Sequence, residues 1–381
     1  MRFLHTSDWH LGRSFHGLSL LPDQEKVLAE IITIIKTKKI EVLLIAGDIY
    51  DRAVPPAEAV NLLNKTLEEI ILHLHVPVIL IAGNHDNPDR LNFGQALFAQ
   101  NGLYIYSTAT KHVQPLKLQD EYGPVYFAPL TYCEPLTATA LSGERKHSHQ
   151  EALDWQIEEM LKQIPANSRM VALSHAFVTG AQPTPDSERP LAVGGSTTVS
   201  LDSFLLFNYT ALGHLHAAQK CSEKVRYCGS LLKYSFAEAL QKKTVQLVEL
   251  NAAGEAAVEE IPLAPTHDLL CLKGTFAELL AKNPADFRDK YVQLTLTDTV
   301  PILDAKHKLE EIYPHILELC YERLALSDKA LDVEAANTRK LTTEELFKNF
   351  FTALHARDLN TEETSLLQQA LNQLEQEGRN A

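Results

Sequence analysis

The stretch Ile79-Leu80-Ile81-Ala82-Gly83-Asn84-His85-Asp86 joins a short apolar run to a glycine, an amide, an imidazole and a carboxylate. The apolar part, bounded by the glycine, predicts a buried strand. Polar side chains placed directly after such a strand would each cost several kcal/mol if they were buried without partners. The stretch therefore predicts a core strand that ends in a functional site.

Four other segments repeat this pattern, in which polar side chains follow an apolar run. In chain order these runs end in Asp8 and His10, in Asp48, in His175, and in His214 and His216. In α/β proteins ligands bind outside the carboxyl ends of the strands. We therefore expect the five endings to converge on one pocket.

Composition limits the classes to which the chain can belong. Its 381 residues suggest two or three domains, and 45% hydrophobic with 22% charged residues is typical of a globular protein. No apolar run reaches the roughly 18 residues of a membrane span, and the N-terminal segment does not resemble a signal peptide, so we expect a cytoplasmic protein. The five scattered cysteines favour buried thiols over a disulfide framework or a zinc site.

The formal net charge of −14 argues against a free-standing nucleic-acid binder, because such proteins bind phosphates mainly through lysine and arginine. A carboxylate-rich metal site, a local basic face or a basic partner can each reverse the local potential. A nucleic-acid substrate therefore stays compatible with the charge.

The first part of the chain alternates predicted strands and helices. Apolar residues at helical spacing predict a helix over residues 21–39, and Pro55-Pro56 begins a second helix. The resulting β-α-β-α-β order predicts a mostly parallel sheet. Residues 225–230 and 244–250 are predicted as antiparallel strands that complete a second sheet. The predicted fold class is α/β, with two sheets stacked in an α/β sandwich.

Three domains are expected. Residues 1–264 carry the site, residues 265–340 form a small α+β capping domain, and residues 341–381 form a C-terminal helical segment. The middle domain has a predicted strand at 291–296 and a predicted helix at 305–312. In the tail, a capping box of Thr342 and Glu345 precedes an apolar stripe, and a second amphipathic helix follows. These helices either fold back on the chain or dock on a partner.

The five endings offer more potential ligands than a mononuclear zinc site needs, and no thiolate. Carboxylate, amide and imidazole donors together suit two hard or borderline divalent ions such as Mn²⁺ or Fe²⁺. Asp48 directly follows the central strand and is the natural carboxylate to bridge them. Two such ions activate a shared water and neutralise phosphoryl oxygens, which predicts phosphoester hydrolysis.

Five motifs carry a family resemblance: Asp8-Trp9-His10, Gly47-Asp48, Gly83-Asn84-His85-Asp86, Ser174-His175 and Gly213-His214-Leu215-His216. In this order they resemble the motifs of the calcineurin-like metallophosphoesterase superfamily. Within it, residues 1–12, 187–195 and 229–236 are similar to the SbcD family of bacterial nuclease subunits. The resemblance covers roughly residues 1–250, and beyond them it rests on the layout of the chain.

The resemblance implies two divalent metal ions, with Mn²⁺ as the expected ion. One would be held by Asp8, His10, Asp48 and His216, and the other by Asp48, Asn84, His175 and His214. It also implies that His85 contacts the scissile phosphate and assists the leaving oxygen, with Asp86 orienting its ring. Archaeal and eukaryotic relatives can carry histidine where this chain has Asp51, which leaves the roles of Asp51 and Arg52 open.

The implied activity is that of a metal-dependent DNA exonuclease and hairpin endonuclease in DNA repair, recombination and replication. The implied partners are DNA, an SbcC-like ATPase and a second copy of the chain in a two-plus-two complex. The capping domain would guide DNA, and the tail helices would dock on the ATPase. Two alternatives stay open. One is a small-molecule phosphodiesterase or nucleotidase, which needs neither the capping domain nor the tail helices. The other is a scaffold protein that has kept the fold and lost the hydrolytic activity.

Three further expectations concern residues beside the motifs. The loop over residues 179–198 follows a site histidine, which favours a functional loop. Trp9 is expected to pack rather than to stack on a base. His5 lies inside the first strand and is expected to be a core or supporting histidine.

Overall fold

The computed structural model describes residues 1–111, 113–185, 187, 198–322, 342–355 and 357–379. It divides into two compact units, Met1–Leu269 and Leu270–Ala381. Among the described residues, every helix is too short or too polar to cross a membrane.

Two six-stranded sheets form the larger unit. The first has the order β16-β15-β1-β4-β5-β6, and the second has the order β13-β14-β12-β9-β8-β7. The strands of the first sheet are β1 Arg2–Thr6, β4 Val42–Ala46, β5 Val78–Ile81, β6 Leu103–Tyr106, β15 Thr244–Leu250 and β16 Ala256–Pro262. Those of the second are β7 Leu116–Asp120, β8 Gly123–Leu130, β9 Arg169–His175, β12 Tyr209–Gly213, β13 Gln219–Lys220 and β14 Val225–Tyr227.

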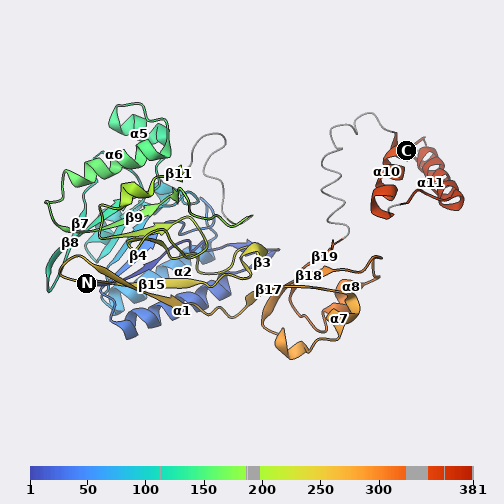
Figure 1. The fold of residues 1–381 in the computed structure, drawn as a ribbon, viewed down its shortest axis with the longest axis horizontal. Helices are drawn as coiled ribbons and strands as arrows, with labels where there is room; N and C mark the ends of the chain where they lie inside the picture. Colours follow the sequence, from blue (N-terminus) through green and yellow to red (C-terminus); the bar gives the residue numbers. More distant parts are fainter. Residues whose placement is uncertain (112, 186, 188–197, 323–341, 356, 380–381) are drawn as a thin grey trace. The chain divides into compact units, whose positions relative to one another are not determined.

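Helices cover the outer faces of the two sheets. Figure 1 shows α1 and α2 on one side of the unit and α5 and α6 on the other. The helices are α1 Leu21–Lys38, α2 Ala57–Glu68 continued by the π-helical turn Glu69–His73, α3 Pro88–Leu91, α4 Gln95–Ala99, α5 Pro135–Ser142 and α6 His149–Leu161, with 3-10 turns at Leu201–Phe204 and Phe236–Glu238. Two short ribbons complete the unit, β2 Ser14–Phe15 with β3 Leu18–Ser19, and β10 Phe177–Val178 with β11 Thr198–Val199. The predicted two-sheet α/β sandwich is confirmed.

Helix α1 shows how the sequence fixes these layers. Val27, Leu28, Ile31 and Ile35 recur at helical spacing and are buried along one side of the helix. The helix ends at Lys39, whose left-handed backbone turns its N–H back to the carbonyl of Ile35. The chain can then enter β4 directly, as the predicted β-α-β crossover requires.

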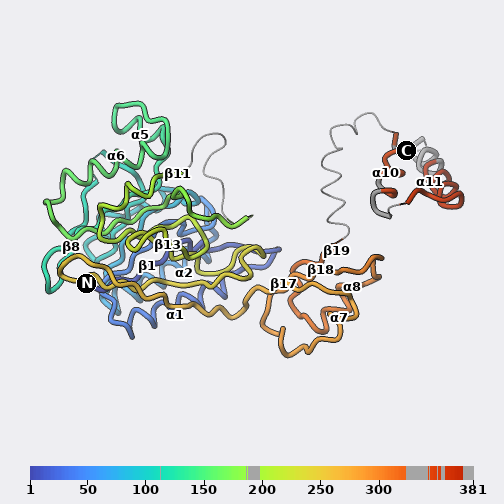
Figure 2. The backbone as a smooth tube through the Cα atoms, in the orientation of Figure 1, coloured from blue at the N-terminus to red at the C-terminus, as the bar shows by residue number. Residues whose placement is uncertain are grey.

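The inner faces of the sheets meet in an apolar core. Phe3 of β1 lies edge to face with Phe127 of β8 and Tyr209 of β12, with ring centroids 6.2 and 5.5 Å away. All three side chains are fully buried, and burial of such a ring contributes about 1.5–3 kcal/mol. This packing fixes one sheet against the other and therefore fixes the relative positions of their strand ends. Figure 2 follows the same backbone, with β1 running between α1 and α6.

Two strands differ from the prediction of an antiparallel pair in the second sheet. β14 is in the second sheet but runs parallel to β12. β15 belongs to the first sheet and pairs antiparallel with β1. β4 pairs with one edge of β1. Without β15, the other edge of β1 would expose unpaired N–H and C=O groups, and β15 supplies their hydrogen-bond partners.

The smaller unit has its own sheet and core. Its strands β17 Asp268–Gly274, β18 Lys290–Leu296 and β19 Ile316–Tyr321 lie in this order, with helices α7 Phe276–Leu280 and α8 Ala305–Leu309 and a 3-10 turn at Pro284–Asp286. Val292, Leu294, Leu309 and Tyr313 are fully buried in the core. The predicted strand at 291–296 is confirmed, and the helix predicted over 305–312 is shorter than expected.

The tail contains α10 Thr343–His355 and α11 Thr361–Arg379. The backbone N–H of Thr342 donates to the Glu345 carboxylate over 2.8 Å, and the N–H of Glu345 donates to Thr342 Oγ1 over 3.3 Å. The predicted capping box is confirmed. Leu346 and Phe347 of the predicted apolar stripe are exposed to solvent.

Candidate metal centre

The five predicted strand endings meet at one place between the two sheets. Asp8 and His10 follow β1, Asp48 follows β4, Asn84 and His85 follow β5, His175 ends β9, and His214 and His216 follow β12. The strands that carry them run parallel within each sheet, so their carboxyl ends lie at the same edge. The structure therefore brings together every residue that the sequence proposed as a metal ligand.

The first group of donor atoms surrounds Nε2 of His10. This atom lies 3.1 Å from Nε2 of His216 and 3.6 Å from Oδ2 of Asp48. Asp8, His10 and His216 each offer an atom within 4.8 Å of the others. The backbone N–H of His214 donates to Asp8 Oδ1 over 3.0 Å, which orients that carboxylate.

The second group surrounds Oδ1 of Asn84. His175 Nε2 lies 3.0 Å from this atom, and His214 Nδ1 lies 3.3 Å from it. His175 Nε2 also lies 3.5 Å from Asp48 Oδ2. The Nδ1 of His175 donates to the carbonyl oxygen of Ala46 over 2.9 Å, so Nε2 is the ring nitrogen that faces Asn84 and Asp48.

The donor set fits divalent metal ions. The candidate ligand atoms lie 3.0–3.6 Å apart, a spacing that suits ligands about 2.1 Å from a shared ion. The set consists of carboxylate, amide and imidazole groups without a thiolate, which suits hard or borderline ions. Asp48 belongs to both groups and is the carboxylate that can bridge them.

The backbone of the ligand positions is held in an unusual conformation. Asp8, His10, Asp48 and His214 all have positive φ angles, of 52°, 44°, 50° and 104°. Such conformations are costly for residues with a Cβ and persist where the surrounding structure enforces them. Here the N–H of Asp8 donates to the carbonyl of Gly47, and the N–H of His10 donates to that of Asp48, so the endings of β1 and β4 hold each other.

Glycines at the strand ends permit this close approach. Gly47 has φ of +90°, and a Cβ there would overlap the ring of His175. A Cβ on Gly213 would overlap the carbonyl oxygen of Ala46. The two sheets can come this close at the site only because neither position carries a side chain.

Burial sets the protonation of the ligands. It lowers the pKa of His10 well below its ordinary value and that of His214 to about 3, so both rings are neutral. Burial raises the pKa of Asp8 to about 6. Burial acts in the same direction on Asp48, but the charge of His175 outweighs it and holds the pKa of that carboxyl well below its usual range. The Asp48 carboxylate outweighs burial at His175 and raises the pKa of that ring to about 9, so His175 would give up its Nε2 proton on binding a metal. Neutral imidazole and ionised carboxylate are the forms that bind metal.

His85 is partly buried at the mouth of the site. Its Nδ1 lies 2.9 Å from the carbonyl oxygen of Asp51, to which it donates, and its Nε2 lies 4.0 Å from Asp48 Oδ2. The backbone N–H of His85 donates to Asp48 Oδ1 over 2.9 Å. The ring is thus held by a main-chain carbonyl, with Nε2 on the side of Asp48, one of the candidate ligands.

The carboxylate of Asp86 contacts backbone groups of two loops. Its buried carboxylate accepts the backbone N–H groups of Ile49, Tyr50 and Gly83 over 3.0–3.1 Å. These bonds tie the loop after β4 to the loop after β5. Asp86 therefore positions the two loops, whereas the ring of His85 is oriented by the carbonyl of Asp51.

Asp51, whose role the sequence left open, lies on the outer side of His10. Its Oδ1 is 3.7 Å from His10 Nδ1 and accepts from the Arg13 guanidinium over 2.9 Å. Arg13 also lies over the ring of Tyr234, at 5.1 Å from the centroid. Arg52 is largely exposed, with its Nε 3.5 Å from Asp51 Oδ2.

Several residues that support the ligands were not predicted from the sequence. Glu238 Oε1 lies 3.1 Å from Nδ1 of His216, and Lys243 pairs with the same carboxylate. Gln24 of α1 donates to the carbonyl of His10 over 2.8 Å and so holds the turn after β1. Lone polar residues on a helix or at a strand end carry no sequence pattern that would single them out.

The expectations for neighbouring aromatic residues are confirmed. Trp9 is completely buried and donates from Nε1 to Thr6 Oγ1 over 3.0 Å. His5 is buried in β1, between the Tyr209 hydroxyl at 2.9 Å and the Leu212 carbonyl at 3.1 Å. Neither side chain is exposed to a substrate.

The loop predicted to be functional, residues 179–198, lies only partly within the described residues. Ser187 is described, and its hydroxyl lies 2.8 Å from Nδ1 of His216. Residues 186 and 188–197, and with them most of the 187–195 motif, lie outside the described residues.

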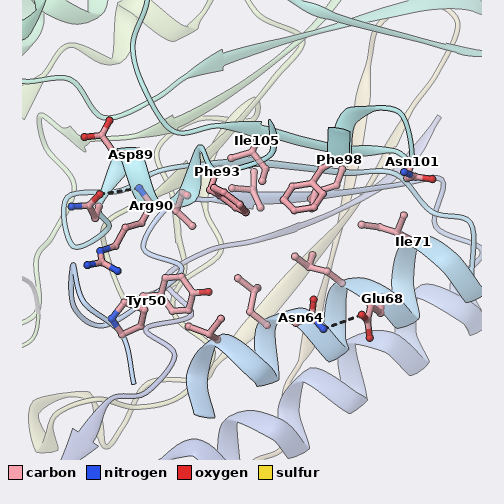
Figure 3. A pocket seen from close by; sticks show the side chains of 18 of the residues that line it. Tyr50, Asn64, Glu68, Ile71, Asp89, Arg90, Phe93, Phe98, Asn101 and Ile105 are labelled. Atoms are coloured by element: carbon pink, nitrogen blue, oxygen red, sulfur yellow. Dashed lines mark hydrogen bonds between the residues drawn. The ribbon is translucent and has the colours of Figure 1, made fainter. Parts of the chain in front are cut away.

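An apolar groove of 990 Å³ lies beside the site, between α2 and the segment that contains α3 and α4. Figure 3 shows Phe93 and Phe98 facing it from one side and Ile71 from the other. Tyr50, whose backbone N–H donates to Asp86, lines the end of the groove. Phe93 is 81% exposed, which marks this face as one suited to an interaction.

Comparison with known proteins identifies the family. The model of the calcineurin-like phosphoesterase family matches residues 1–217, more than half of the chain. A second family model, described as the type 5 capsule protein repressor C-terminal domain, matches residues 265–354.

A curated relative, the D subunit of the nuclease SbcCD from Staphylococcus epidermidis, is 31% identical over 354 residues, which span 92% of each chain. Among solved structures, a Thermus thermophilus protein is similar with a TM-score of 0.40 and 12% identity, over 68% of this chain and 98% of that one. A dimetal phosphatase from Danio rerio has a TM-score of 0.36 and 10% identity, over 70% and 99%. The chain therefore belongs to the calcineurin-like phosphoesterase family of metal-dependent phosphoester hydrolases, and within it to the SbcD family of SbcCD nuclease subunits.

Proposed function

We propose that the chain is a metal-dependent DNA nuclease that acts with an SbcC-type ATPase in DNA repair, recombination and replication. The observation that carries this proposal is the set of converging donor atoms in a chain 31% identical to an SbcCD nuclease component over 92% of its length. A small-molecule phosphodiesterase would need no counterpart of residues 265–354, which match a second family model. The nuclease is therefore the favoured interpretation.

Two divalent ions are part of the proposal, with Mn²⁺ as the proposed ion. One would be held by Asp8, His10, Asp48 and His216, and the other by Asp48, Asn84, His175 and His214. When bound, such ions lower the pKa of water and neutralise the oxygens of a phosphodiester. The nearness of Asp48 Oδ2 to His10 and to His175, at 3.6 and 3.5 Å, supports Asp48 as the bridge.

His85 is the proposed catalytic residue. Because its Nδ1 donates to the carbonyl of Asp51, its Nε2 is the atom available to the substrate. In its protonated form Nε2 would donate a hydrogen bond to the scissile phosphate and then a proton to the leaving oxygen. Its exposed fraction of 11%, against 3% for the Asp48 side chain, leaves the ring accessible at the mouth of the site.

We also propose a role for each domain of the chain. Residues 1–264 form the nuclease domain, residues 265–340 cap it and guide DNA, and residues 341–381 dock on the ATPase. The exposed Leu346 and Phe347 of α10 support docking on an apolar surface. Residues 323–341 lie outside the described residues. A cytoplasmic location follows from the proposed substrate and the ATP-dependent partner.

A homodimer within a two-plus-two complex is also proposed. The support is the apolar groove and the exposed side chains of Val60, Leu72, Phe93 and Phe98 that line it. Two copies that present this same surface to each other would bury it on both sides. Sedimentation velocity tests the proposal: wild type is expected to sediment as a dimer and Phe93→Asp as a monomer, and a monomeric wild type would contradict it.

Cleavage of a labelled DNA hairpin in the presence of Mn²⁺ tests the proposed activity. We expect the full chain to cut the hairpin and Asp48→Ala to lose the activity, with a small chromogenic phosphodiester as a second substrate. Cleavage of the small ester alone, even after addition of the ATPase partner, would contradict the nuclease. Removal of residues 342–381 is expected to leave ester cleavage intact and to abolish binding of the ATPase.

A further inference from the structure

A buried ion pair lies directly behind His216. Glu238 is completely buried and Lys243 is 4% exposed, and Lys243 Nζ lies 2.5 Å from Glu238 Oε2. Removing two charges from water costs free energy of solvation. Their mutual attraction offsets this cost only when the geometry is good and further hydrogen bonds are made. The position of this pair therefore calls for a reason beyond stability.

Both members of the pair contact His216. Glu238 Oε1 lies 3.1 Å from Nδ1 of His216, and Lys243 Nζ donates to the His216 carbonyl oxygen over 2.8 Å. The hydroxyl of Ser187 donates to Glu238 Oε1 over 2.5 Å and lies 2.8 Å from the same Nδ1. The carboxylate thus holds the ring of His216 while the ammonium holds its backbone.

The remaining bonds of Lys243 fix its position. Its Nζ also donates to Ser230 Oγ over 2.9 Å and to Gln241 Oε1 over 2.8 Å. With four acceptors around the ammonium, the lysine is rigidly placed and keeps the Glu238 carboxylate ionised. The Glu238 carboxylate can therefore only accept from His216.

This contact determines which ring nitrogen of His216 carries a proton. Nδ1 donates to the carboxylate, which leaves a lone pair on Nε2. Nε2 is the atom that lies 3.1 Å from Nε2 of His10, inside the first donor group. A carboxylate on the far nitrogen also makes an imidazole a stronger metal ligand.

We propose that Glu238 and Lys243 are positioning residues that fix the tautomer and orientation of His216 for metal binding. The proposal rests on the metal site of the proposed function. Lys243 acts through Glu238 and the His216 carbonyl, and neither residue touches the substrate.

Titration calorimetry of the metal-free full chain with MnCl₂ tests the proposal. Glu238→Gln replaces the charged acceptor by a neutral one, and loss of such a supporting contact weakens metal affinity by about 10- to 100-fold. We expect this loss in Glu238→Gln for one of the two sites and a smaller loss for Lys243→Arg, which keeps the charge. Unchanged affinity in Glu238→Gln would overturn the proposal.

A matched control separates positioning from stability. Asp120 and Arg169 form another buried ion pair in the same unit, with side chains 2% and 9% exposed. Asp120→Asn is expected to lower the unfolding midpoint without changing the affinity for Mn²⁺. A loss of affinity in Asp120→Asn equal to that in Glu238→Gln would show a general structural effect and overturn the proposal.

The double variant Glu238→Gln/Lys243→Met covers the case in which a single change prevents folding. It removes both charges together, so no unpaired ion stays buried. We expect it to fold, by circular dichroism and unfolding midpoint, and to bind Mn²⁺ as weakly as Glu238→Gln. Wild-type affinity in the folded double variant would overturn the inference alone, whereas absence of Mn²⁺ binding in wild type would overturn the proposed metal site as well.

Discussion

Asp48 Oδ2 lies 3.5 Å from His175 Nε2, so the end of β4 in one sheet meets the end of β9 in the other. The two residues are far apart in the sequence and belong to different sheets. Their contact depends on the apolar core that sets the spacing of the sheets and on the glycines that allow the strand ends to approach. The site is therefore a property of the sandwich as a whole.

Replacement of Asp48 by asparagine is expected to abolish the activity. The proposed bridging carboxylate contributes to both donor groups, and loss of several kcal/mol of metal-derived stabilisation slows hydrolysis on the order of a thousandfold. Hairpin cleavage and metal content after dialysis check this together. Asp202→Asn, an exposed carboxylate, serves as the control and is expected to behave as wild type. Full activity in Asp48→Asn would contradict the bridging role.

His85→Ala is expected to separate chemistry from metal binding. Loss of a general acid lowers kcat by about 10²- to 10⁴-fold. Because His85 is not among the proposed ligands, the Mn²⁺ content is expected to stay at the wild-type level, as measured by elemental analysis. The exposed His147 provides the control variant His147→Ala. A loss of metal in His85→Ala would assign it to the ligand set instead.

Asp86→Ala is expected to destabilise the loops around the site. Three backbone N–H groups would lose their acceptor, and each buried donor left without a partner costs about 1–3 kcal/mol. Urea unfolding is expected to show a loss of at least this size. An unchanged free energy of unfolding combined with a lower kcat would instead support the role of orienting His85.

Gly47→Ala and Gly17→Ala compare two glycines with similar backbones. Their φ angles are +90° and +83°, but a Cβ at position 47 would overlap His175, whereas position 17 is open. Both changes incur the conformational cost of about 1–2 kcal/mol. Only Gly47→Ala is expected to lose Mn²⁺ binding as well, measured by calorimetry. Equal Mn²⁺ affinity in the two variants would show that the close approach is not required.

The Asp120–Arg169 pair predicts how stability changes in acid. Hydrogen bonds from Arg169 hold the pKa of Asp120 below its usual range. A lowered folded-state pKa adds stability that is complete above the unfolded-state pKa of about 4 and is lost as the pH falls through the folded value. Asp120→Asn is expected to be less stable by about 3 kcal/mol at pH 7. Urea unfolding from pH 7 to 2 is expected to show this difference shrinking below pH 4; a constant difference would contradict the assignment.

The strands and the convergence of the candidate ligands could be predicted from the sequence because the signals are local. Ile79 to Asp86 contains both the apolar run and the residues that follow it, and the same is true of the segments around Asp8, Asp48, His175 and His214. Strand ends in a parallel sheet share one edge, so convergence followed from a general rule. Capping of α10 by Thr342 and Glu345 was predictable for the same reason.

Other features depend on contacts between distant segments, which periodicity does not encode. The partner of β15 is β1, almost the whole unit away in the chain, and this choice follows from the open edge of the first sheet. Asp86 holds two loops rather than its neighbour His85, because the loop after β4 presents its N–H groups there.

The sequence by itself therefore determined the order of strands and helices along the first half of the chain, the donor types and the chemistry they suit. Only the tertiary structure decided which nitrogen of each histidine faces the site and which buried groups support it. Glu238 and Lys243 illustrate the reason. The role of this buried carboxylate and ammonium depends on their contacts with His216, and only the packing of the two sheets brings these residues together.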